Sequence, residues 1–446
     1  MIDGFSIIGA TLVLIIVSYF LYVQHVNKLK IQEKIDASNK QRQQQQNDKN
    51  KNKAGSDNKT NTKSDNNVHI SKKQRVTDSN YSHPWLFTTL KGHTGKILDM
   101  DFSTNGKYLA TCSEDRTLLV WSTKDLGNTK DRKSFRVNVQ YDHGEKICWS
   151  PDNRALLIHK FTQRAVEVYK FERTDSNWFT NPTKSITFSE KHVEDIVGFG
   201  ISCTGRFIMT CSNKNDLILW DTKGNVLATL DTFLLNTYCA KISNCGKFVT
   251  ACGWNTDVRV WEVKFDKTNE FQAIQQAFDL TGHKSSVYDV AFNHDSSFMA
   301  TICKDNSWNI FNTRIEYAKG ESARRIVQGV YEQSTTRPQI AISPQGNVVA
   351  ITKGGSVMLY SVKTGLQDIL IENIYTEITS IKFDEFGKFL YTTGDKYVRI
   401  FHNITGYKES LLTAQEKLKQ TKTSAMKDRL EQQIGEYEEI IEKYNH

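Results

Sequence analysis

The strongest constraint on the fold is a strand-and-turn unit at residues 92–121, GHTGKILDMDFSTNGKYLATCSEDRTLLVW. Residues 97–102 alternate apolar and polar side chains, as in a β-strand with one buried face. Two polar turns, STNG at 103–106 and EDR at 114–116, lead into two further apolar stretches. Short apolar stretches joined by tight polar turns predict one antiparallel unit of an all-β fold.

This unit recurs along the chain. Between residues 83 and 406 we find seven units with two lead-in strands, a turn and a third strand that ends in a large aromatic residue. Repeats of this length are typical of β-propellers, in which closure of the ring removes exposed sheet edges. We therefore expect a seven-bladed propeller, with residues 86–90 as the outer strand of the last blade. The aromatic residues are Trp121, Tyr169, Trp220, Trp261, Phe311, Tyr360 and Phe401.

The first unit resembles the WD-repeat family, through Gly92-His93 at its start and Trp121 at its end. The resemblance implies a structural tetrad in which the side chains of His93, Thr111, Asp115 and Trp121 are hydrogen-bonded in series. Buried polar groups are stable when all of their hydrogen bonds are made. The tetrad residues are therefore predicted to be structural, not catalytic.

The other units depart from this pattern. The fifth unit keeps His283, Thr301 and Asp305, but Phe311 replaces the tryptophan and has no hydrogen-bond donor, so its network is expected to end early. The third unit has Lys214 where the turn aspartate is expected. The second and sixth units have no clear tetrad, and apolar and aromatic packing is predicted to hold these blades together.

The first 82 residues have a different character. Residues 5–23 contain no charged side chain and are long enough to cross a bilayer as a helix. No basic segment precedes them and no small-residue cleavage site follows, which favours a retained anchor over a cleaved signal peptide. Lys28, Lys30 and Lys34 follow, so the positive-inside rule predicts that residues 1–4 are lumenal and that the rest of the chain is cytosolic.

Residues 24–82 are predicted to be a disordered basic linker. Between Lys28 and Arg75 there are 13 Lys or Arg and 5 Asp or Glu, an excess equal to the net charge of +8 of the whole chain. This stretch is too poor in apolar residues to offset the entropy of ordering. We interpret its cations as a solvated linker, with attraction to anionic lipid headgroups and weak RNA binding as the alternatives.

The remaining composition argues for binding and against catalysis. The eight cysteines lie between residues 112 and 303 without a CxxC pair, which predicts buried free thiols in a reducing compartment and no metal site. The sequence contains no GxSxG, P-loop, HExxH or dinucleotide-binding motif. We therefore expect no enzymatic activity and no cofactor.

The last segment, residues 407–446, has a helical pattern. Its apolar residues recur at three- and four-residue spacing, and Ser424 is suited to cap a second helix. Two interpretations are open: a helical pair packed on the propeller, or a coiled-coil arm for a partner or a second copy.

Residues 92–121, 245–265 and 278–296, with the hydrophobic N terminus and the C-terminal helix, are similar to a membrane-anchored branch of the WD-repeat family. The resemblance implies a non-enzymatic scaffold of the endoplasmic reticulum membrane with its propeller in the cytosol. It further implies a role in the unfolded-protein response through a stress-sensing kinase of that membrane. The alternative function is an RNA- or ribosome-binding tether that acts in translation.

Six residues in the loops at one end of the blades are the candidates for binding a partner. Trp254 is the strongest, because an indole in the turn GWNT is unlikely to be fully buried, although packing against the next blade is the alternative. The other five candidates are basic: Lys96, Arg116, Lys214, Lys284 and Lys304.

Overall fold

The computed structural model describes residues 81–127, 133–174, 178–421 and 423–444. The predicted anchor and all of the linker except residues 81 and 82 lie outside these ranges. Within them, 28 strands are followed by two helices, and residues Thr77–His446 form one compact unit. In this described part of the chain, no helix is both long and apolar enough to cross a membrane.

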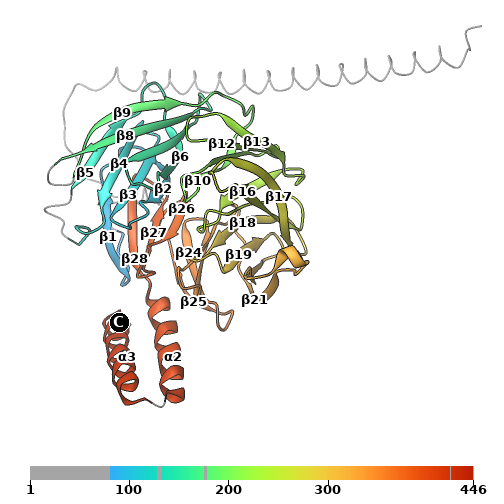
Figure 1. Ribbon diagram of the computed structural model, residues 1–446. Helices are drawn as coiled ribbons and strands as arrows, with labels where there is room; N and C mark the ends of the chain where they lie inside the picture. The colour runs from blue at the N-terminus through green and yellow to red at the C-terminus, as the bar shows by residue number, and fades with distance from the viewer. Residues whose placement is uncertain (1–80, 128–132, 175–177, 422, 445–446) are drawn as a thin grey trace, which may run out of the picture. The chain divides into compact units, whose positions relative to one another are not determined.

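The strands form five four-stranded sheets and one eight-stranded sheet (Figure 1). Within each group of four, neighbouring strands run antiparallel, as the short turns between them require. Two of the four-stranded sheets come first: β2 (Ile97–Phe102), β3 (Tyr108–Ser113), β4 (Thr117–Ser122) and β5 (Ser134–Asn138); then β6 (Gly144–Trp149), β7 (Ala155–Lys160), β8 (Val166–Arg173) and β9 (Phe179–Thr187).

The eight-stranded sheet follows, with β10 (Ile196–Ile201), β11 (Ile208–Ser212), β12 (Asp216–Trp220), β13 (Val226–Asp231), β14 (Thr237–Ile242), β15 (Phe248–Gly253), β16 (Val258–Phe265) and β17 (Phe271–Leu280). Its two halves, β10–β13 and β14–β17, meet at a single parallel pair, Gly198 with Ala240. Gly198 permits this approach, because a Cβ added there would lie 2.5 Å from the Cβ of Ala240.

Three sheets complete the set. They are β18 (Val287–Phe292), β19 (Phe298–Cys303), β20 (Ser307–Asn312) and β21 (Arg324–Val330); β22 (Ile340–Ile342), β23 (Val348–Lys353), β24 (Ser356–Ser361) and β25 (Gln367–Ile371); and β26 (Ser380–Phe383), β27 (Phe389–Thr393) and β28 (Tyr397–His402) joined by β1 (Leu86–Lys91). The first described strand and the last strand lie side by side, blue against orange in Figure 1. The prediction that residues 86–90 pair with the end of the domain is confirmed. All seven predicted aromatic residues lie in third strands.

The hydrophobic core lies between neighbouring sheets. One cluster, for example, joins Leu118 and Val120 of β4 to Ile147 of β6 and Leu156 of β7. Burial of an aliphatic side chain of this size contributes about 1.5–3 kcal/mol, so each seam adds substantial stability. Six cysteines are buried in these seams, but Cys203 and Cys245 are exposed, which corrects the expectation of uniformly buried thiols.

Two aspartates on inner strands each tie three sheets together. Asp101 on β2 binds Lys382 Nζ of β26 at 2.7 Å and accepts the Trp149 N–H of β6 at 2.9 Å. Asp289 on β18 repeats this arrangement: it binds Lys241 Nζ of β14 at 2.8 Å and accepts the N–H of Ile340, the first residue of β22, at 2.9 Å. Each aspartate is neutralised by the lysine that it binds, so these four charged residues hold the sheets together.

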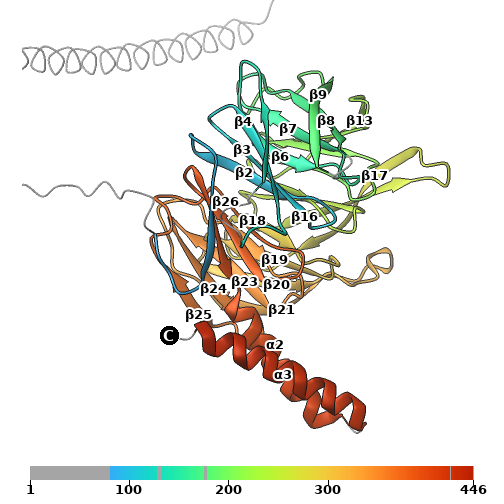
Figure 2. The same ribbon diagram turned by 90° about the vertical axis from the view of Figure 1, so that its left-hand side faces the viewer.

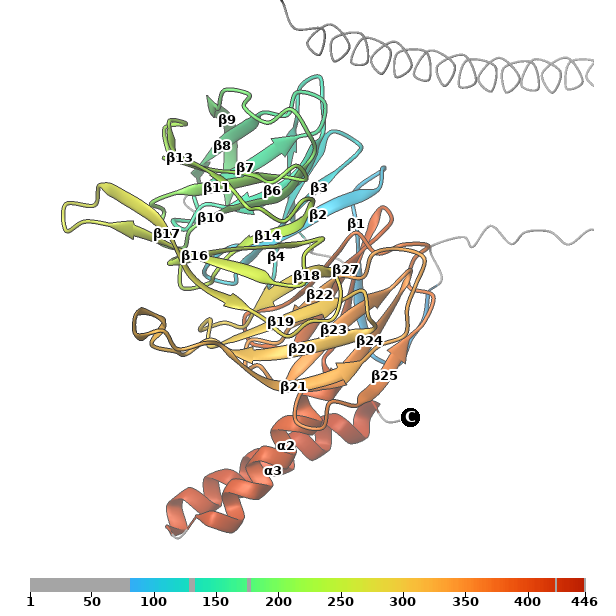
Figure 3. The same cartoon turned by 90° about the vertical axis from the view of Figure 1, so that its right-hand side faces the viewer.

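The two C-terminal helices, α2 (Ile404–Gln420) and α3 (Ser424–Tyr444), form a hairpin that projects from one end of the sheets (Figures 2 and 3). Helix α2 begins three residues before the expected boundary, because the Asn403 side chain accepts the Gly406 N–H at 3.0 Å and caps it. Asn403 also begins an N-x-S/T glycosylation sequon, Asn403-Ile404-Thr405, but it is only 1% exposed and leaves no room for a glycan.

The base of the hairpin is part of the domain core. Ile404 of α2 and Ile441 of α3 join the cluster of the last two sheets, and the Trp85 indole donates to the Tyr444 carbonyl at 3.2 Å. The rest of the hairpin extends away from the strands. The base thus packs on the sheets, as the first interpretation expects, and the coiled-coil arm for a partner or a second copy stays a prediction.

Candidate interaction surface

The loop before the first strand of each unit and the turn between its second and third strands lie at one end of the sheets. Main-chain hydrogen bonds join the two segments, as in Glu114 N–H to the Lys96 carbonyl at 3.0 Å and Lys304 N–H to the Ser286 carbonyl at 2.9 Å. We call this end the tetrad face. It comprises loops 92–96, 139–143, 188–195, 232–236, 281–286, 331–339 and 372–379 and turns 114–116, 161–165, 213–215, 254–257, 304–306, 354–355 and 394–396.

In the first unit the four expected side chains are joined by hydrogen bonds. Asp115 contacts His93 Nδ1 at 3.1 Å, His93 Nε2 contacts Thr111 Oγ1 at 2.8 Å, and the Trp121 indole donates to Thr111 at 3.2 Å. Thr117 adds a hydroxyl that donates to Asp115 at 2.6 Å. Burial alone would raise the pKa of Asp115, but these hydrogen bonds outweigh it and hold that pKa well below its ordinary value.

The third unit has a complete network that the sequence pattern missed. His192 Nε2 contacts Thr210 Oγ1 at 2.6 Å, and the Trp220 indole donates to the same hydroxyl at 2.8 Å. The carboxylate on His192 Nδ1 comes from Asp216. Lys214 does occupy the turn position, as the sequence indicated, and the carboxylate comes instead from a residue two positions later. Asp216 is the first residue of β12, the register position that Thr117 holds in β4.

The fifth unit is less complete than expected. His283 Nε2 contacts Thr301 Oγ1 at 2.9 Å, but His283 Nδ1 has no hydrogen-bond partner in the described part of the chain. Asp305 instead accepts the Ser307 hydroxyl at 2.6 Å, so it does not join the network. Phe311 packs against the imidazole with ring centroids 5.3 Å apart. Burial lowers the pKa of His283, which favours its neutral form.

The second unit is held by a buried ion pair in addition to apolar packing. Lys160 Nζ lies 3.0 Å from Glu167, and both side chains are almost fully buried. The Tyr169 hydroxyl donates to Glu167 at 2.8 Å, and Lys184 Nζ lies 2.6 Å from it. Burial would raise the pKa of Glu167, but these partners lower it. The expected apolar and aromatic packing is present, and this buried ion pair, which the sequence did not predict, adds to it.

The structure places all six binding candidates on the tetrad face. Trp254 is 52% exposed, and Lys304 Nζ lies 5.8 Å from its ring centroid, a cation–π contact. Lys96 is half-buried and forms a surface ion pair with Glu377 at 3.5 Å, whereas the other three are exposed in separate turns. These three are Arg116, Lys214 and Lys284.

Apart from Trp254, sequence reasoning missed a series of exposed apolar side chains on the same face. Tyr141 is 88% exposed and Leu235 is 66% exposed. The series spans three consecutive four-strand groups, β6–β9, β10–β13 and β14–β17. Apolar residues in loops that are usually polar were the available signal. We call this set the apolar series: Tyr141, Phe161, Val193, Phe233, Leu235 and Trp254.

The part of the series around Trp254 is locally continuous. The Trp254 N–H donates to the Asn236 carbonyl at 2.9 Å, and the Asn255 side chain donates to the Phe233 carbonyl at 3.0 Å. Phe233 and Leu235 have φ values of 53° and 66°, a left-handed conformation that side chains of this type rarely adopt. The fold therefore holds two large apolar side chains in solvent at a conformational cost.

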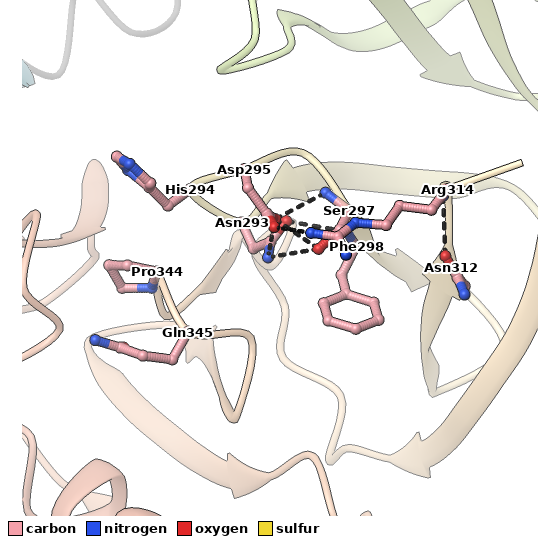
Figure 4. A pocket seen from close by; sticks show the side chains of 9 residues that line it. All are labelled: Asn293, His294, Asp295, Ser297, Phe298, Asn312, Arg314, Pro344 and Gln345. Atoms are coloured by element: carbon pink, nitrogen blue, oxygen red, sulfur yellow. Dashed lines mark hydrogen bonds and ion pairs between the residues drawn. The ribbon is translucent and has the colours of Figure 1, made fainter.

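A pocket of about 400 Å³ lies at the opposite end of the strands, between the turns that follow β18 and β22 (Figure 4). Asp295 in this pocket accepts from Asn293 at 2.8 Å and Ser297 at 2.5 Å and pairs with Arg314 at 2.5 Å. Its charged groups therefore neutralise each other and leave no free acid–base pair. Among the described residues, no cluster of His, Cys, Asp and Glu could hold a metal ion.

Comparisons with known proteins agree with this architecture. The WD40 family model, "WD domain, G-beta repeat", matches residues 85–122, 274–312 and 371–402. Transducin beta-like protein 2 of Mus musculus is 38% identical over 372 residues, which cover 83% of this chain and 84% of the mouse protein. The chain belongs to the transducin beta-like protein 2 family of WD40 proteins. The Homo sapiens protein of this name is 37% identical over 373 residues, 83% of each chain.

More distant WD-repeat proteins share only part of the chain. The WD repeat-containing protein WDS homolog of Arabidopsis thaliana is 24% identical over 281 residues, 52% of this chain and 51% of that protein. As a member of the transducin beta-like protein 2 family, the chain is a WD40 scaffold-type protein, and WD40 domains mediate protein–protein interaction. The hydrogen-bonded tetrads of the first and third units are part of that scaffold.

Proposed function

We propose that this chain is a non-enzymatic scaffold, tethered to the endoplasmic reticulum membrane, that binds a protein partner through its tetrad face. The partner we propose is a stress-sensing kinase of that membrane, in the unfolded-protein response. The observation that carries the binding proposal is the apolar series. Large apolar side chains exposed together on a soluble domain mark an interaction site.

A seven-bladed propeller is the form of scaffold we propose. The described strands give seven groups of four when the eight-stranded sheet is divided at its single Gly198–Ala240 pair. The inner strand β2 contacts both β6 and β26, as it would in a closed ring. Closure of this kind leaves side chains and loops, not sheet edges, as the surfaces available for recognition.

The energetic case rests on Phe233, Leu235 and Trp254. Full burial of side chains of this size contributes about 1.5–3 kcal/mol each. Because these groups are already ordered in the free protein, less conformational entropy is lost on binding. The neighbouring Lys304 and Lys214 would then set orientation and association rate more than affinity.

The membrane assignment rests on sequence. Residues 5–23 are uncharged, and the first lysines follow at 28, 30 and 34. This charge order supports an orientation with the WD40 domain in the cytosol. The test is protease protection of a C-terminal tag in intact microsomes. Digestion without detergent is expected, and a protected tag would refute the cytosolic orientation.

The binding proposal is tested with the full chain in microsomes. The variant Phe233→Asn, Leu235→Asn, Trp254→Ser removes the apolar side chains, and asparagine tolerates positive φ, so the loop keeps its conformation. The matched control is Val226→Thr, Ile326→Thr, two exposed apolar residues on outer strands. We expect at least a tenfold loss of co-precipitated kinase in the first variant and no change in the control.

Equal co-precipitation by the two variants would show that the tetrad face does not bind the kinase. The second candidate function, an RNA- or ribosome-binding tether, is favoured by exposed Lys214, Lys284 and Lys304 on the same face as well as by the basic linker. That function predicts steep salt dependence and loss of binding when residues 40–75 are deleted. A kinase scaffold predicts little effect of the deletion.

A further inference from the structure

The far end of the α2–α3 arm is a separate surface from the tetrad face. All seven residues from 423 to 429 are exposed, so the first turns of α3 leave their side chains largely in solvent at the end of the α2–α3 hairpin. Figures 2 and 3 show this end pointing away from the strands. We call residues 417–420 and 423–429 the arm tip. Because the arm tip is exposed, it can contact another molecule or a membrane.

The arm tip is basic. Lys417 and Lys419 close α2, and Lys427 and Arg429 follow the start of α3, whose first turn contains no acidic residue. The tip contains a single acidic residue, Asp428, in its described part. Cations early in a helix oppose the helix dipole and lower helix stability. Their presence there points to an anionic partner.

The charge of the arm changes sign along its length. Behind the tip, the exposed side chains of α3 are mainly acidic, including Glu431, Glu438, Glu439 and Glu442. We call residues 430–444 of α3 the shaft. An anionic surface would therefore be attracted to the tip and repelled by the shaft. The arm can approach such a surface end-on but not along its side.

The tip also carries an apolar group without aromatic neighbours. Met426 is 51% exposed at the end of the arm. A flexible thioether side chain can enter the boundary between lipid headgroups and acyl chains. Single-stranded nucleic acid is usually held by stacking on aromatic side chains, and the described tip contains none. Lysines around an exposed methionine therefore favour lipid over RNA.

We propose that the arm tip binds the headgroups of anionic phospholipids and inserts Met426 at the bilayer surface. The arm would be a second membrane contact in addition to the proposed N-terminal anchor, and it would fix the orientation of the domain relative to the bilayer. Each cation near an anionic membrane strengthens binding about fivefold. Four cations are therefore enough to hold the tip on the membrane when the proposed N-terminal anchor already keeps the domain close to the bilayer.

The test uses residues Thr77–His446, which form a compact unit whose first and last strands pair. Co-sedimentation is measured with vesicles of phosphatidylserine and phosphatidylcholine in equal parts, and with pure phosphatidylcholine vesicles. The unit is expected to bind only the anionic vesicles, and more weakly as salt increases. Because this form lacks the anchor, the result does not depend on whether the proposed tether or kinase is correct.

Charge-reversal variants locate the contact. Lys427→Glu with Arg429→Glu is expected to weaken vesicle binding by about 25-fold or more. Lys223→Glu with Lys267→Glu makes the same charge change in two exposed turns of the sheets and should have little effect. Met426→Ser should weaken binding by a smaller factor at unchanged charge. Equal effects of the two charge variants would overturn the proposal.

Two further results separate lipid from nucleic acid. Glu438→Lys with Glu439→Lys should strengthen vesicle binding, because it removes repulsion along the shaft. Binding of fluorescent poly(U) is measured with the same variants. Tip-dependent binding of poly(U) without vesicle binding would make the tip a nucleic-acid site and refute the lipid assignment. Circular dichroism of each variant excludes unfolding as the cause.

Discussion

The first and fifth units provide a matched pair of networks for testing how much the indole contributes to the tetrad. Thr111 Oγ1 contacts the His93 imidazole at 2.8 Å and the Trp121 indole N–H at 3.2 Å, with a longer contact to the Leu119 carbonyl at 3.4 Å. In the part of the chain that the structure describes, Thr301 Oγ1 contacts the His283 imidazole at 2.9 Å but no indole, because Phe311 has no donor. The substitution of threonine by valine keeps the volume and removes only the hydroxyl.

The expected costs follow from the number of buried groups left without a partner. A buried polar group that loses its hydrogen bond costs about 1–3 kcal/mol. Thr111→Val leaves two such groups without a partner and is expected to cost about 2–6 kcal/mol, whereas Thr301→Val leaves one and should cost about 1–3 kcal/mol. Thermal midpoints and urea midpoints of the Thr77–His446 unit measure both losses.

A third variant isolates the indole. In a Trp121→Phe background Thr111 Oγ1 loses its indole partner and, like Thr301 Oγ1, still contacts an imidazole, so Thr111→Val should then cost about as much as Thr301→Val. Its effect is therefore expected to fall by about 1 kcal/mol or more relative to the wild-type background. If Thr111→Val costs the same in both backgrounds, the indole hydrogen bond contributes nothing and the reasoning is refuted.

Two further predictions concern other buried groups. Burial, aided by Lys443, lowers the pKa of His402 to about 4. The neutral imidazole should therefore contribute about 1–2 kcal/mol to the free energy of unfolding above pH 6.5, after discounting for partial exposure, and this contribution is lost as the pH falls toward 4. Between pH 7.5 and 5, the thermal midpoint of His402→Gln should fall less than that of the wild-type protein. An equal fall in both proteins would contradict it. Lys160→Met leaves Glu167 without its buried partner and should lower the free energy of unfolding by about 3–5 kcal/mol. The double variant Lys160→Met, Glu167→Met should recover at least half of that loss, and additive losses in urea unfolding would show that the pair is not coupled.

Strand identity was predictable from sequence, because it depends on local patterning. Alternation of apolar and polar residues, polar turns and aromatic strand ends recur within each unit, so the third strands and the pairing of β1 with β28 were anticipated. The hydrogen-bonded set around His93 was also expected, through the resemblance of its spacing to a known repeat.

The departures arise where a side chain's partner depends on three-dimensional register. Asp216 supplies a carboxylate from a position two residues after Lys214, because both the turn and the first strand residue can face the same imidazole. Asp305, at the expected position, turns instead to Ser307. A linear motif records which residue types are present but not which of two neighbours points inward.

The sequence by itself determined the repeat, the strands within it, the helical ending and the contrast between a basic N-terminal segment and a nearly neutral domain. Each of these follows from composition or from periodicity within a few residues. Only the tertiary structure decided that Asp101 and Asp289 each join three sheets, that Lys160 meets Glu167, and that apolar loop residues from three separate units share one face. The two aspartate contacts and the shared apolar face depend on the packing of separate sheets into one compact unit, whereas Lys160 meets Glu167 because the neighbouring strands β7 and β8 pair.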